Sequence, residues 1–213
     1  MAEMRIESVN IGLPVAIDWR GEKVWTGIFK RPVDRIVGVK FQNMAGDGQA
    51  DIVNHGGTNK AVYVYASEHY PYWNNFLQKE IDIGGFGENI TTSGLMDSAV
   101  FIGDEYRFGS AVLQAVQPRM PCAKLGIRFN DAMMTKHFFK ARRNGTYFKV
   151  LQEGTVQRGD RIERIKRSDY NISMQDIVDN YVLKQKDMEK VKLLSELDIL
   201  PKWFKGEFKK MLA

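Results

Sequence analysis

The distribution of glycine along the chain constrains its fold more than any other sequence feature. As far as Arg167, glycine-containing turns separate short runs of alternating apolar and polar residues, whereas the chain after Ser168 has one glycine, one proline and helical periodicity. Alternation with a period of two is typical of strands, and a period near 3.6 is typical of helices. We therefore predict a strand-rich domain over residues 1–167 and a small helical domain over residues 168–213.

The first region is predicted to form many short strands with a few peripheral helices. Its strand-like runs are RIESVNIGL, KAVYVY, VFIGDEYRFG, AVLQAV and YFKVLQEGTVQRGDRIERI, the last read as two strands. One helix is expected to begin with Ser67 as N-cap, and another, capped by Asn130 or Asp131, to end at Asn144-Gly145. Many short strands joined by glycine-rich turns favour a β-sandwich or β-barrel. The predicted fold class is α+β, mainly β.

The second region reads as three short helices. Ser173 and Asp176 resemble a capping box with Asp in place of Glu, and apolar residues then follow at helical spacing. Pro201 suits the first position of the third helix. Because so short a segment can barely hold a core of its own, we expect it to dock on the barrel or on a partner.

Composition and charge narrow the functional class. The 213 residues are 44% hydrophobic and 27% charged, which is ordinary for a globular protein. The single cysteine excludes an internal disulfide and fits a reducing cytoplasm. The N-terminus has no secretory signal, and no apolar run approaches the roughly 18 residues of a membrane helix. A net charge of +5 suits anionic small molecules but does not argue for nucleic acid. We predict a cytoplasmic protein without a membrane anchor or a nucleic-acid partner.

The only cysteine lies in the segment QPRMPCAKLGIRF, residues 117–129. If Pro121 begins a helix, Cys122 lies in its first turn, where free N–H groups and the helix dipole favour a thiolate. Arg119 adds positive charge nearby, and Lys124 and Arg128 contribute, although Lys124 at helical spacing is expected to project to another side. A lone cysteine is also commonly a small buried hydrophobe. The residues alone leave these two readings evenly balanced.

Three other segments carry polar residues beside glycine-rich turns or basic loops. His55, Gly56 and Gly57 form a turn whose backbone can bind an anion, and Lys60 follows it. Glu88 and Asn89 follow GGFG, and Lys30 lies in TGIFKRPV. Each segment alone is explained equally well by a structural turn or a solvated loop. The chain has no dinucleotide-binding fingerprint, no serine nucleophile elbow and no zinc-ligand spacing.

These four segments, together and in this order, closely resemble the MOSC family, which is named for the C-terminal domain of molybdenum cofactor sulfurases. The tail from Ile172 resembles the three-helix appendage of the bacterial YiiM-type branch. The resemblance implies a β-barrel with a small three-helix C-terminal domain. It also implies a cysteine that binds molybdenum or carries sulfur. In the reductase branches, the molybdenum cofactor reduces N-hydroxylated bases and amidoxime-like compounds.

The resemblance implies a reductase of N-hydroxylated compounds, such as hydroxylaminopurines, that acts in detoxification and binds the molybdenum cofactor (molybdopterin). Cys122 would ligate molybdenum through a soft thiolate. The cofactor phosphate and pterin would contact cationic groups and backbone donors. The expected set is Lys30, His55, Gly56, Gly57, Lys60, Arg119, Lys124 and Arg128, with Glu88, Asn89 and His55 as supporting or substrate contacts. One cysteine cannot store electrons as an internal disulfide, so an external electron-donating reductase is implied. Whether the chain forms a homodimer stays open.

Two alternatives remain open from the sequence. The first is a sulfur carrier that receives a persulfide on Cys122 and hands it onward, with a nearly identical site. The second is a non-enzymatic binding module whose helical tail recruits a partner. The redox hypothesis requires a solvent-reachable Cys122 sulfur near Lys60 and the His-Gly-Gly turn.

Overall fold

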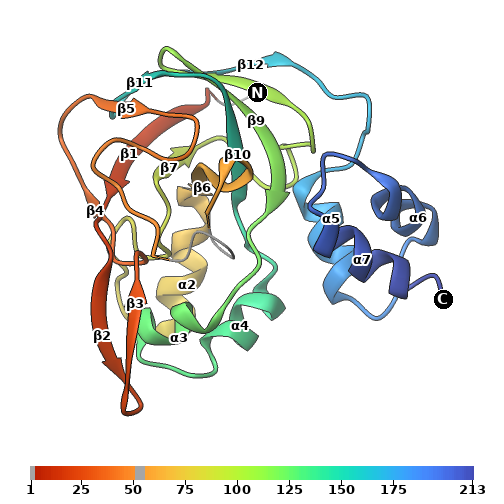
Figure 1. Ribbon diagram of the computed structural model, residues 1–213, viewed down its shortest axis with the longest axis horizontal. Helices are drawn as coiled ribbons and strands as arrows, with labels where there is room; N and C mark the ends of the chain where they lie inside the picture. The colour runs from red at the N-terminus through yellow and green to blue at the C-terminus, as the bar shows by residue number, and fades with distance from the viewer. Residues whose placement is uncertain (1–2, 51–55) are drawn as a thin grey trace.

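A computed structural model describes residues 3–50 and 56–213, and its centre is an eight-stranded sheet (Figure 1). The strand order is β12-β8-β9-β10-β6-β7-β1-β4, and every pairing is antiparallel except that of β6 with β7. The strands of the large sheet are β1 (Arg5–Ile11), β4 (Arg31–Pro32), β6 (Val62–Ala66), β7 (Ile90–Ser93), β8 (Glu105–Phe108), β9 (Ala111–Pro118), β10 (Thr146–Gln152) and β12 (Ile162–Lys166). Two small sheets pair β2 (Val15–Trp19) with β3 (Glu22–Thr26) and β5 (Val37–Val39) with β11 (Gly154–Val156).

The large sheet curls so that strands from its two ends meet. An isolated antiparallel bridge joins Arg5 to Arg161. The Ile6 amide donates to the Asp160 carbonyl at 2.9 Å, and the Ile162 amide donates to the Met4 carbonyl at 2.9 Å. The mixed fold with a large sheet confirms the predicted fold class. Within the described residues this contact is a single bridge and not a continuous ladder, so the sheet is not a closed barrel of paired strands.

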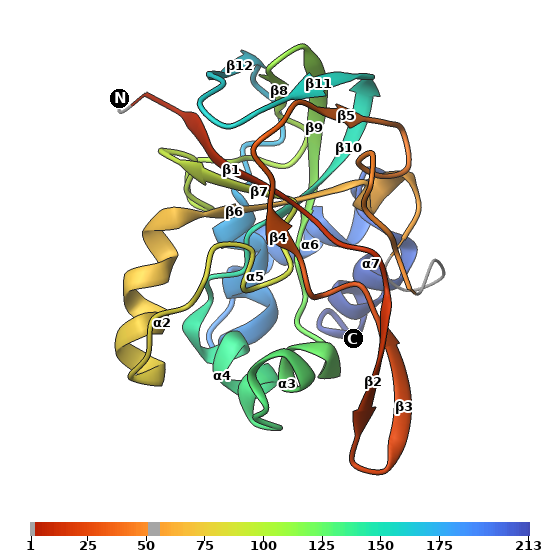
Figure 2. The ribbon, with the colours of Figure 1, turned by 90° about the vertical axis from the view of Figure 1, so that its left-hand side faces the viewer.

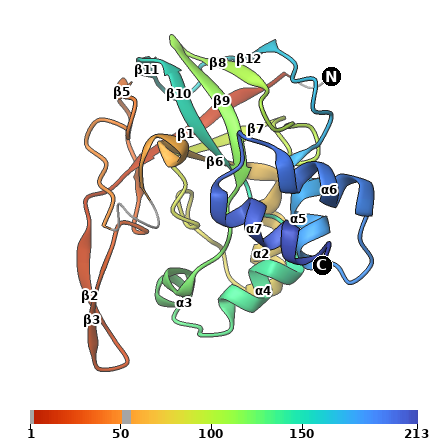
Figure 3. The ribbon, with the colours of Figure 1, turned by 45° about the vertical axis from the view of Figure 1, so that its right-hand side comes forward.

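Six α-helices accompany the sheets in the described part of the chain: α2 (Tyr70–Leu77), α3 (Ala123–Phe129), α4 (Met134–Ala141), α5 (Met174–Val182), α6 (Met188–Glu196) and α7 (Lys202–Lys210). Helices α2, α3 and α4 lie together at one end of the sheet, whereas the β2–β3 hairpin projects away from the rest of the chain (Figure 2). Helices α5, α6 and α7 form a compact group on one side of the molecule (Figure 3). None of the helices described here is long and apolar enough to cross a bilayer.

One predicted helix start is confirmed by the structure, and another is wrong. Ser173 and Asp176 form the predicted capping box, with the Ser173 hydroxyl accepting from the Asp176 amide at 3.0 Å. The prediction of Ser67 as an N-cap is wrong, because a 3₁₀ turn over Ser67–His69 precedes α2 and the Ser67 side chain makes no cap bond. The last strand-like run was predicted to form two strands, and the structure has three there, β10, β11 and β12. The additional strand is β11, which follows β10 in the chain but pairs with β5.

The C-terminal helices share one apolar core with the sheet. Met174 and Ile177 of α5 belong to the same buried cluster as Leu113 and Phe148 of the sheet. The Ile102 amide donates to the Ile172 carbonyl at 2.9 Å, which also ties the backbones together. The helical segment therefore docks on the sheet, and a domain boundary near residue 167 stays a prediction. A second, aromatic cluster, including Tyr65, Trp73, Phe86 and Phe138, lies around α2, α3 and α4.

Candidate active site

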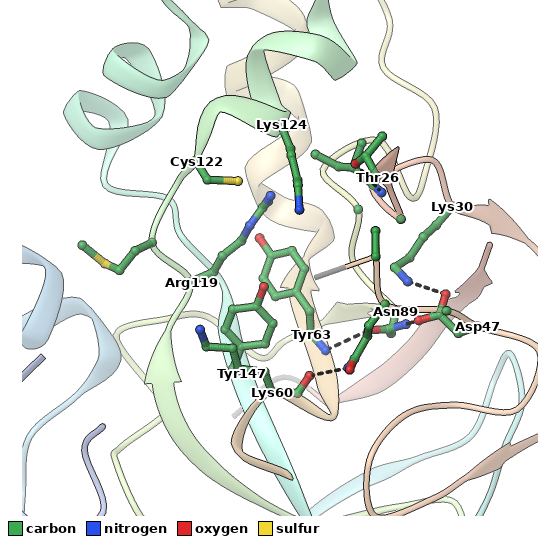
Figure 4. A pocket seen from close by; sticks show the side chains of 17 residues that line it. Thr26, Lys30, Asp47, Lys60, Tyr63, Asn89, Arg119, Cys122, Lys124 and Tyr147 are labelled. Atoms are coloured by element: carbon green, nitrogen blue, oxygen red, sulfur yellow. Dashed lines mark hydrogen bonds and ion pairs between the residues drawn. The ribbon is translucent and has the colours of Figure 1, made fainter. Parts of the chain in front are cut away.

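Cys122 is the N-cap of α3 and presents its sulfur to a pocket (Figure 4). Its backbone is extended, with φ −134° and ψ 173°, and the helix begins one residue later at Ala123. The prediction that Cys122 lies within the first helical turn is therefore wrong by one position. Its carbonyl accepts hydrogen bonds from the Leu125 amide at 3.0 Å and from the Thr135 hydroxyl at 3.1 Å. These contacts fix the backbone, and the thiol itself is half-buried.

Four cationic side chains line the same pocket as Cys122: Lys30, Lys60, Arg119 and Lys124. Lys124 reaches into the space that Cys122 faces (Figure 4), which corrects the expectation that it projects to another side. That expectation assumed helical spacing between the two residues, whereas Cys122 precedes the helix in an extended conformation. Asp47 is the only carboxylate among the described residues that line the pocket. The pocket therefore suits an anionic ligand and places positive charge around the sulfur.

Arg119 is the buried cation of this group, with 6% of its surface exposed. Its Nη1 donates to the Phe86 carbonyl at 2.6 Å, and its guanidinium lies 4.9 Å from the Tyr63 ring centroid. Burial lowers the pKa of Arg119, but the neighbouring Tyr63, Tyr147 and Cys122 side chains raise it, and the net direction is upward. Figure 4 shows the hydroxyl groups of Tyr63 and Tyr147 on the guanidinium side of their rings. Arg119 is thus a fixed positive charge beside the cysteine.

Asp47 joins two of the predicted site residues on the opposite wall. Its Oδ1 accepts from the Lys30 ammonium group and from the Gly12 amide, the latter at 2.9 Å, and its Oδ2 accepts from Asn89 Nδ2 at 2.8 Å. Burial lowers the pKa of Lys30, whereas the charge of Asp47 and its hydrogen bond raise it, and the net direction is downward. The Asn89 Oδ1 accepts from the Tyr63 amide at 3.0 Å, which fixes the side chain. Lys30 is therefore held by a carboxylate that also orients Asn89.

The structure brings some of the sequence-predicted residues together and separates others. Cys122, Lys30, Lys60, Asn89, Arg119 and Lys124 line one pocket. Gly57, at φ 85°, begins the 3₁₀ turn that ends at Lys60, and neither it nor Gly56 is among the lining residues. Arg128 lies elsewhere, because its Nε donates to the Gly85 carbonyl at 3.1 Å and its guanidinium stacks on Phe29. His55 lies outside the described residues.

Glu88 is fully buried behind the pocket and does not line it. It accepts hydrogen bonds from the Tyr70 hydroxyl, from the Gly84 amide at 3.0 Å, from the Phe86 amide at 3.1 Å and from the Thr91 hydroxyl at 2.9 Å. These bonds fix the glycine-rich turn that carries the Phe86 carbonyl, the acceptor of Arg119. Glu88 is thus a structural anchor of the site and is not a ligand-facing group in this conformation.

The stability contributed by Glu88 is expected to depend on pH. Burial raises the pKa of Glu88 from 4.5, and although the hydrogen bonds from Tyr70 and Thr91 lower it, the net direction is upward. At a pH between 4.5 and the raised folded-state pKa, Glu88 of the native protein retains a proton that the unfolded chain has lost. This contribution is fully present below pH 4.5 and is lost as the pH rises through the folded-state pKa. Urea unfolding of wild type and Glu88→Gln should show the difference in unfolding free energy shrinking as the pH rises above 4.5. A constant difference would contradict this assignment.

Sequence reasoning missed Asp47, Tyr63 and Tyr147, which all line the pocket. Asp47 lies between two glycines, which was a usable signal for a carboxylate at a tight turn. Tyr63 and Tyr147 are cross-strand partners in β6 and β10, with ring centroids 5.2 Å apart. All five residues of β6 are buried, so no alternation of burial marked the side that faces the pocket.

Comparison with known proteins identifies the family to which this chain belongs. The MOSC domain model matches residues 51–163, which include the glycine-rich turns, the cysteine and the strands around them. The chain therefore belongs to the MOSC domain family.

Its relatives include a YiiM protein of known structure. The chain resembles YiiM from Geobacillus stearothermophilus with a TM-score of 0.82 and 32% identity, over 99% of this chain and 100% of that one. It is 45% identical to YflK from Bacillus subtilis over 79% of this chain and 76% of that protein. It is also 36% identical to a protein named reductase from Gibberella moniliformis, over 69% of this chain but 27% of that protein. The likeness to YiiM thus extends through the C-terminal helices.

Proposed function

We propose that this chain is a molybdenum-cofactor-binding reductase of N-hydroxylated compounds, such as hydroxylaminopurines, and that Cys122 ligates molybdenum. The observation that carries the proposal is the half-buried Cys122 thiol in a pocket with four cations and one carboxylate among its described lining residues. Membership of the MOSC family and the relative named reductase support the same class of activity. The proposed setting is the cytoplasm.

The residues present fit the chemistry of that cofactor. A thiolate is a soft ligand and suits a soft, sulfur-rich metal centre. The cofactor phosphate needs cationic groups, and Lys60, Lys124 and Arg119 lie on the walls of the same pocket. Asn89, held by Asp47 and the Tyr63 amide, offers a fixed amide toward the same space. When bound, the cofactor would supply the two-electron redox chemistry of the reaction.

The proposed reaction converts an N-hydroxylated base into the amine and water. The N–O bond breaks, two electrons arrive from an external reductase, and two protons complete the amine and the water molecule. In this proposal Arg119 stabilises the Cys122 thiolate, because a buried guanidinium retains its charge. Tyr63, Tyr147 and Met120 line the same pocket and would form part of the wall around a bound substrate. The chain's own residues thus bind, orient and set the local charge.

Metal and sulfur analysis tests this proposal against the sulfur-carrier alternative. The full chain is produced in a host that makes molybdenum cofactor, purified, and analysed for molybdenum and for the intact mass of Cys122-containing peptides. Stoichiometric molybdenum without a persulfide supports the reductase. A persulfide on Cys122 without metal supports the carrier, and the absence of both supports a binding module. Either of the last two results overturns the proposal.

A further inference from the structure

Lys30 carries the most buried ammonium group among the lysines that line the pocket, and it lies across the pocket from Cys122 (Figure 4). Only 9% of its surface is exposed, whereas Lys60 and Lys124 are half-buried. Its ammonium group donates to Asp47 Oδ1. Because Asp47 accepts two further hydrogen bonds from the surrounding chain, the Lys30 ammonium group has a fixed position in the pocket wall.

The proposed reaction consumes two protons, and the first is needed where the N–O bond breaks. As two electrons enter that bond, the oxygen leaves with the bonding pair as hydroxide unless a proton reaches it in the same step. Hydroxide is a strong base and a poor leaving group, whereas water leaves readily. A positioned acid typically accelerates such a step by about a hundredfold to ten-thousandfold. The reaction therefore calls for a pocket group that holds a transferable proton.

The hydroxyl and guanidinium groups of the pocket are less suited to this step than Lys30. The Tyr63 hydroxyl already donates to a backbone carbonyl at 2.8 Å, and burial raises the pKa of both Tyr63 and Tyr147. The pKa of Arg119 is raised, so its guanidinium keeps its protons. Burial lowers the pKa of Lys30, and although the charge of Asp47 raises it, the net direction is downward. This direction brings Lys30 closer to the pH at which a general acid works best.

We propose that Lys30 is the general acid of the reaction and protonates the oxygen that leaves the substrate nitrogen. This inference rests on the proposed function. The N–O bond breaks as two electrons arrive from the external reductase, and the oxygen takes a proton from the Lys30 ammonium group and leaves as water. The amine nitrogen takes the second proton from solvent, and the neutral Lys30 amine then regains its own proton from solvent. One turnover thus consumes two electrons and two protons, and Asp47 holds the ammonium group in place.

The test compares two substrates that differ in their need for this proton, benzamidoxime and its O-acetyl ester. Acetate leaves as a weakly basic carboxylate, since carboxyl groups ionise near about pH 4, and therefore needs no proton. Full-length protein from a cofactor-competent host is supplied with a reduced viologen, and the benzamidine formed from each substrate is measured. Lys30→Met is expected to lower kcat for benzamidoxime by about a hundredfold and kcat for the ester by less than about threefold.

A second variant separates the proton of Lys30 from its charge. Lys30→Arg retains a positive charge beside Asp47, but a guanidinium does not release a proton in a protein. It should therefore show the same selective loss with benzamidoxime as Lys30→Met. This variant carries the test if Lys30→Met does not fold.

The pH dependence of turnover gives a further readout. With benzamidoxime, the wild-type kcat should fall as the pH rises through the pKa of Lys30, which lies below 10.5, because the neutral amine has no proton to donate. This fall should be absent with the ester and in Lys30→Arg. The charges that act most directly on the ammonium group are Asp47, Glu88 and Arg119. The other titratable groups that line the pocket are Lys60, Tyr63, Cys122, Lys124 and Tyr147. A second hollow that Lys30 also lines adds Arg31, Tyr70, Glu80, Asp82 and Arg128. All of these groups are retained in the variants, and their titration would alter the ester rate as well.

Amine labelling of the full chain made without cofactor examines Lys30 apart from turnover. Acetic anhydride modifies only the neutral amine, and mass spectrometry of the peptide that contains Lys30 gives the extent of modification at each pH. Half-maximal modification is expected below pH 10.5 in wild type, because burial lowers the pKa of Lys30. Asp47→Asn removes the charge that raises this pKa, so its midpoint should be lower still. A midpoint at or above pH 10.5 in wild type, or one that does not fall in Asp47→Asn, would count against Lys30 as the acid.

A neighbouring cation provides the matched control, and the outcomes separate this inference from the proposed function. Arg31 is exposed and does not line the pocket with Cys122, so Arg31→Met should reduce both substrates at the wild-type rate. Bound molybdenum should be equal in wild type and both Lys30 variants, and a selective loss with benzamidoxime then supports the inference. An equal loss with both substrates, or loss of molybdenum from the Lys30 variants, overturns the inference while the proposed function stands. Wild-type protein that binds molybdenum and reduces neither substrate overturns the proposed function and this inference with it.

Discussion

Replacing Cys122 with serine is expected to lower the reduction of an N-hydroxylated base by at least about a hundredfold. A serine hydroxyl is a hard and very weakly acidic group, so it cannot replace a thiolate as ligand to a soft metal. The cationic residues of the pocket remain in this variant, and the fold should be preserved because Cys122 is half-buried and its sulfur lies at the pocket surface. Turnover with a reduced viologen as electron donor measures the loss.

A control variant shows whether a substitution away from the pocket also lowers turnover. Met188→Leu alters an exposed residue of α6, which is 49% exposed and does not line the pocket, and it should retain wild-type turnover. If Cys122→Ser kept more than half of the wild-type rate, the cysteine would not be the essential group of the reaction. Cys122 would then lie in the predicted pocket, but the role predicted for its sulfur would be wrong.

Removing the Glu88 side chain is expected to cause the largest loss of stability. Glu88→Ala leaves the Gly84 and Phe86 amides and the hydroxyls of Tyr70 and Thr91 without their shared acceptor in a buried site. Each unsatisfied buried donor costs roughly 1–3 kcal/mol, and the sum after local relaxation is expected to be about 3–6 kcal/mol. Chemical denaturation monitored by tryptophan fluorescence measures the change.

An exposed acidic residue close to Glu88 in the sequence provides the control. Glu80→Ala removes a solvent-exposed carboxylate and should change the unfolding free energy by less than about 0.5 kcal/mol. A loss below about 1 kcal/mol in Glu88→Ala would mean that water replaces the carboxylate and that Glu88 is no anchor. Because the turn also carries the acceptor of Arg119, we expect a folded fraction of Glu88→Ala to bind the cofactor poorly.

Local signals in the sequence predicted much of the fold. The Ser173–Asp176 capping box and the three C-terminal helices depend on contacts within a few residues, so their patterns are visible in the chain. The order of the strands depends on pairing between distant segments, such as β6 with β7 and β10, and no local pattern encodes it. Periodicity left a sandwich and a barrel open, and the resemblance to a known family implied a barrel. The observed sheet curls so that its two ends meet, but without a continuous ladder between them.

The sequence predicted those site residues that are chemically distinctive, such as the single cysteine. It did not predict the roles of residues whose partners are brought together only by the fold. A single cysteine beside a proline and an arginine is conspicuous, and the pocket contains it with Arg119. Glu88 looked like a ligand because a carboxylate after glycines is polar, but its partners are backbone amides that only the folded turn supplies.

The most direct test of the central claim is X-ray absorption spectroscopy at the molybdenum edge on wild type and Cys122→Ser, each purified from a cofactor-competent host. The account predicts bound molybdenum in wild type with one more sulfur ligand than in any molybdenum retained by Cys122→Ser. An identical sulfur coordination in the two proteins, or wild-type protein that never acquires molybdenum, would contradict it.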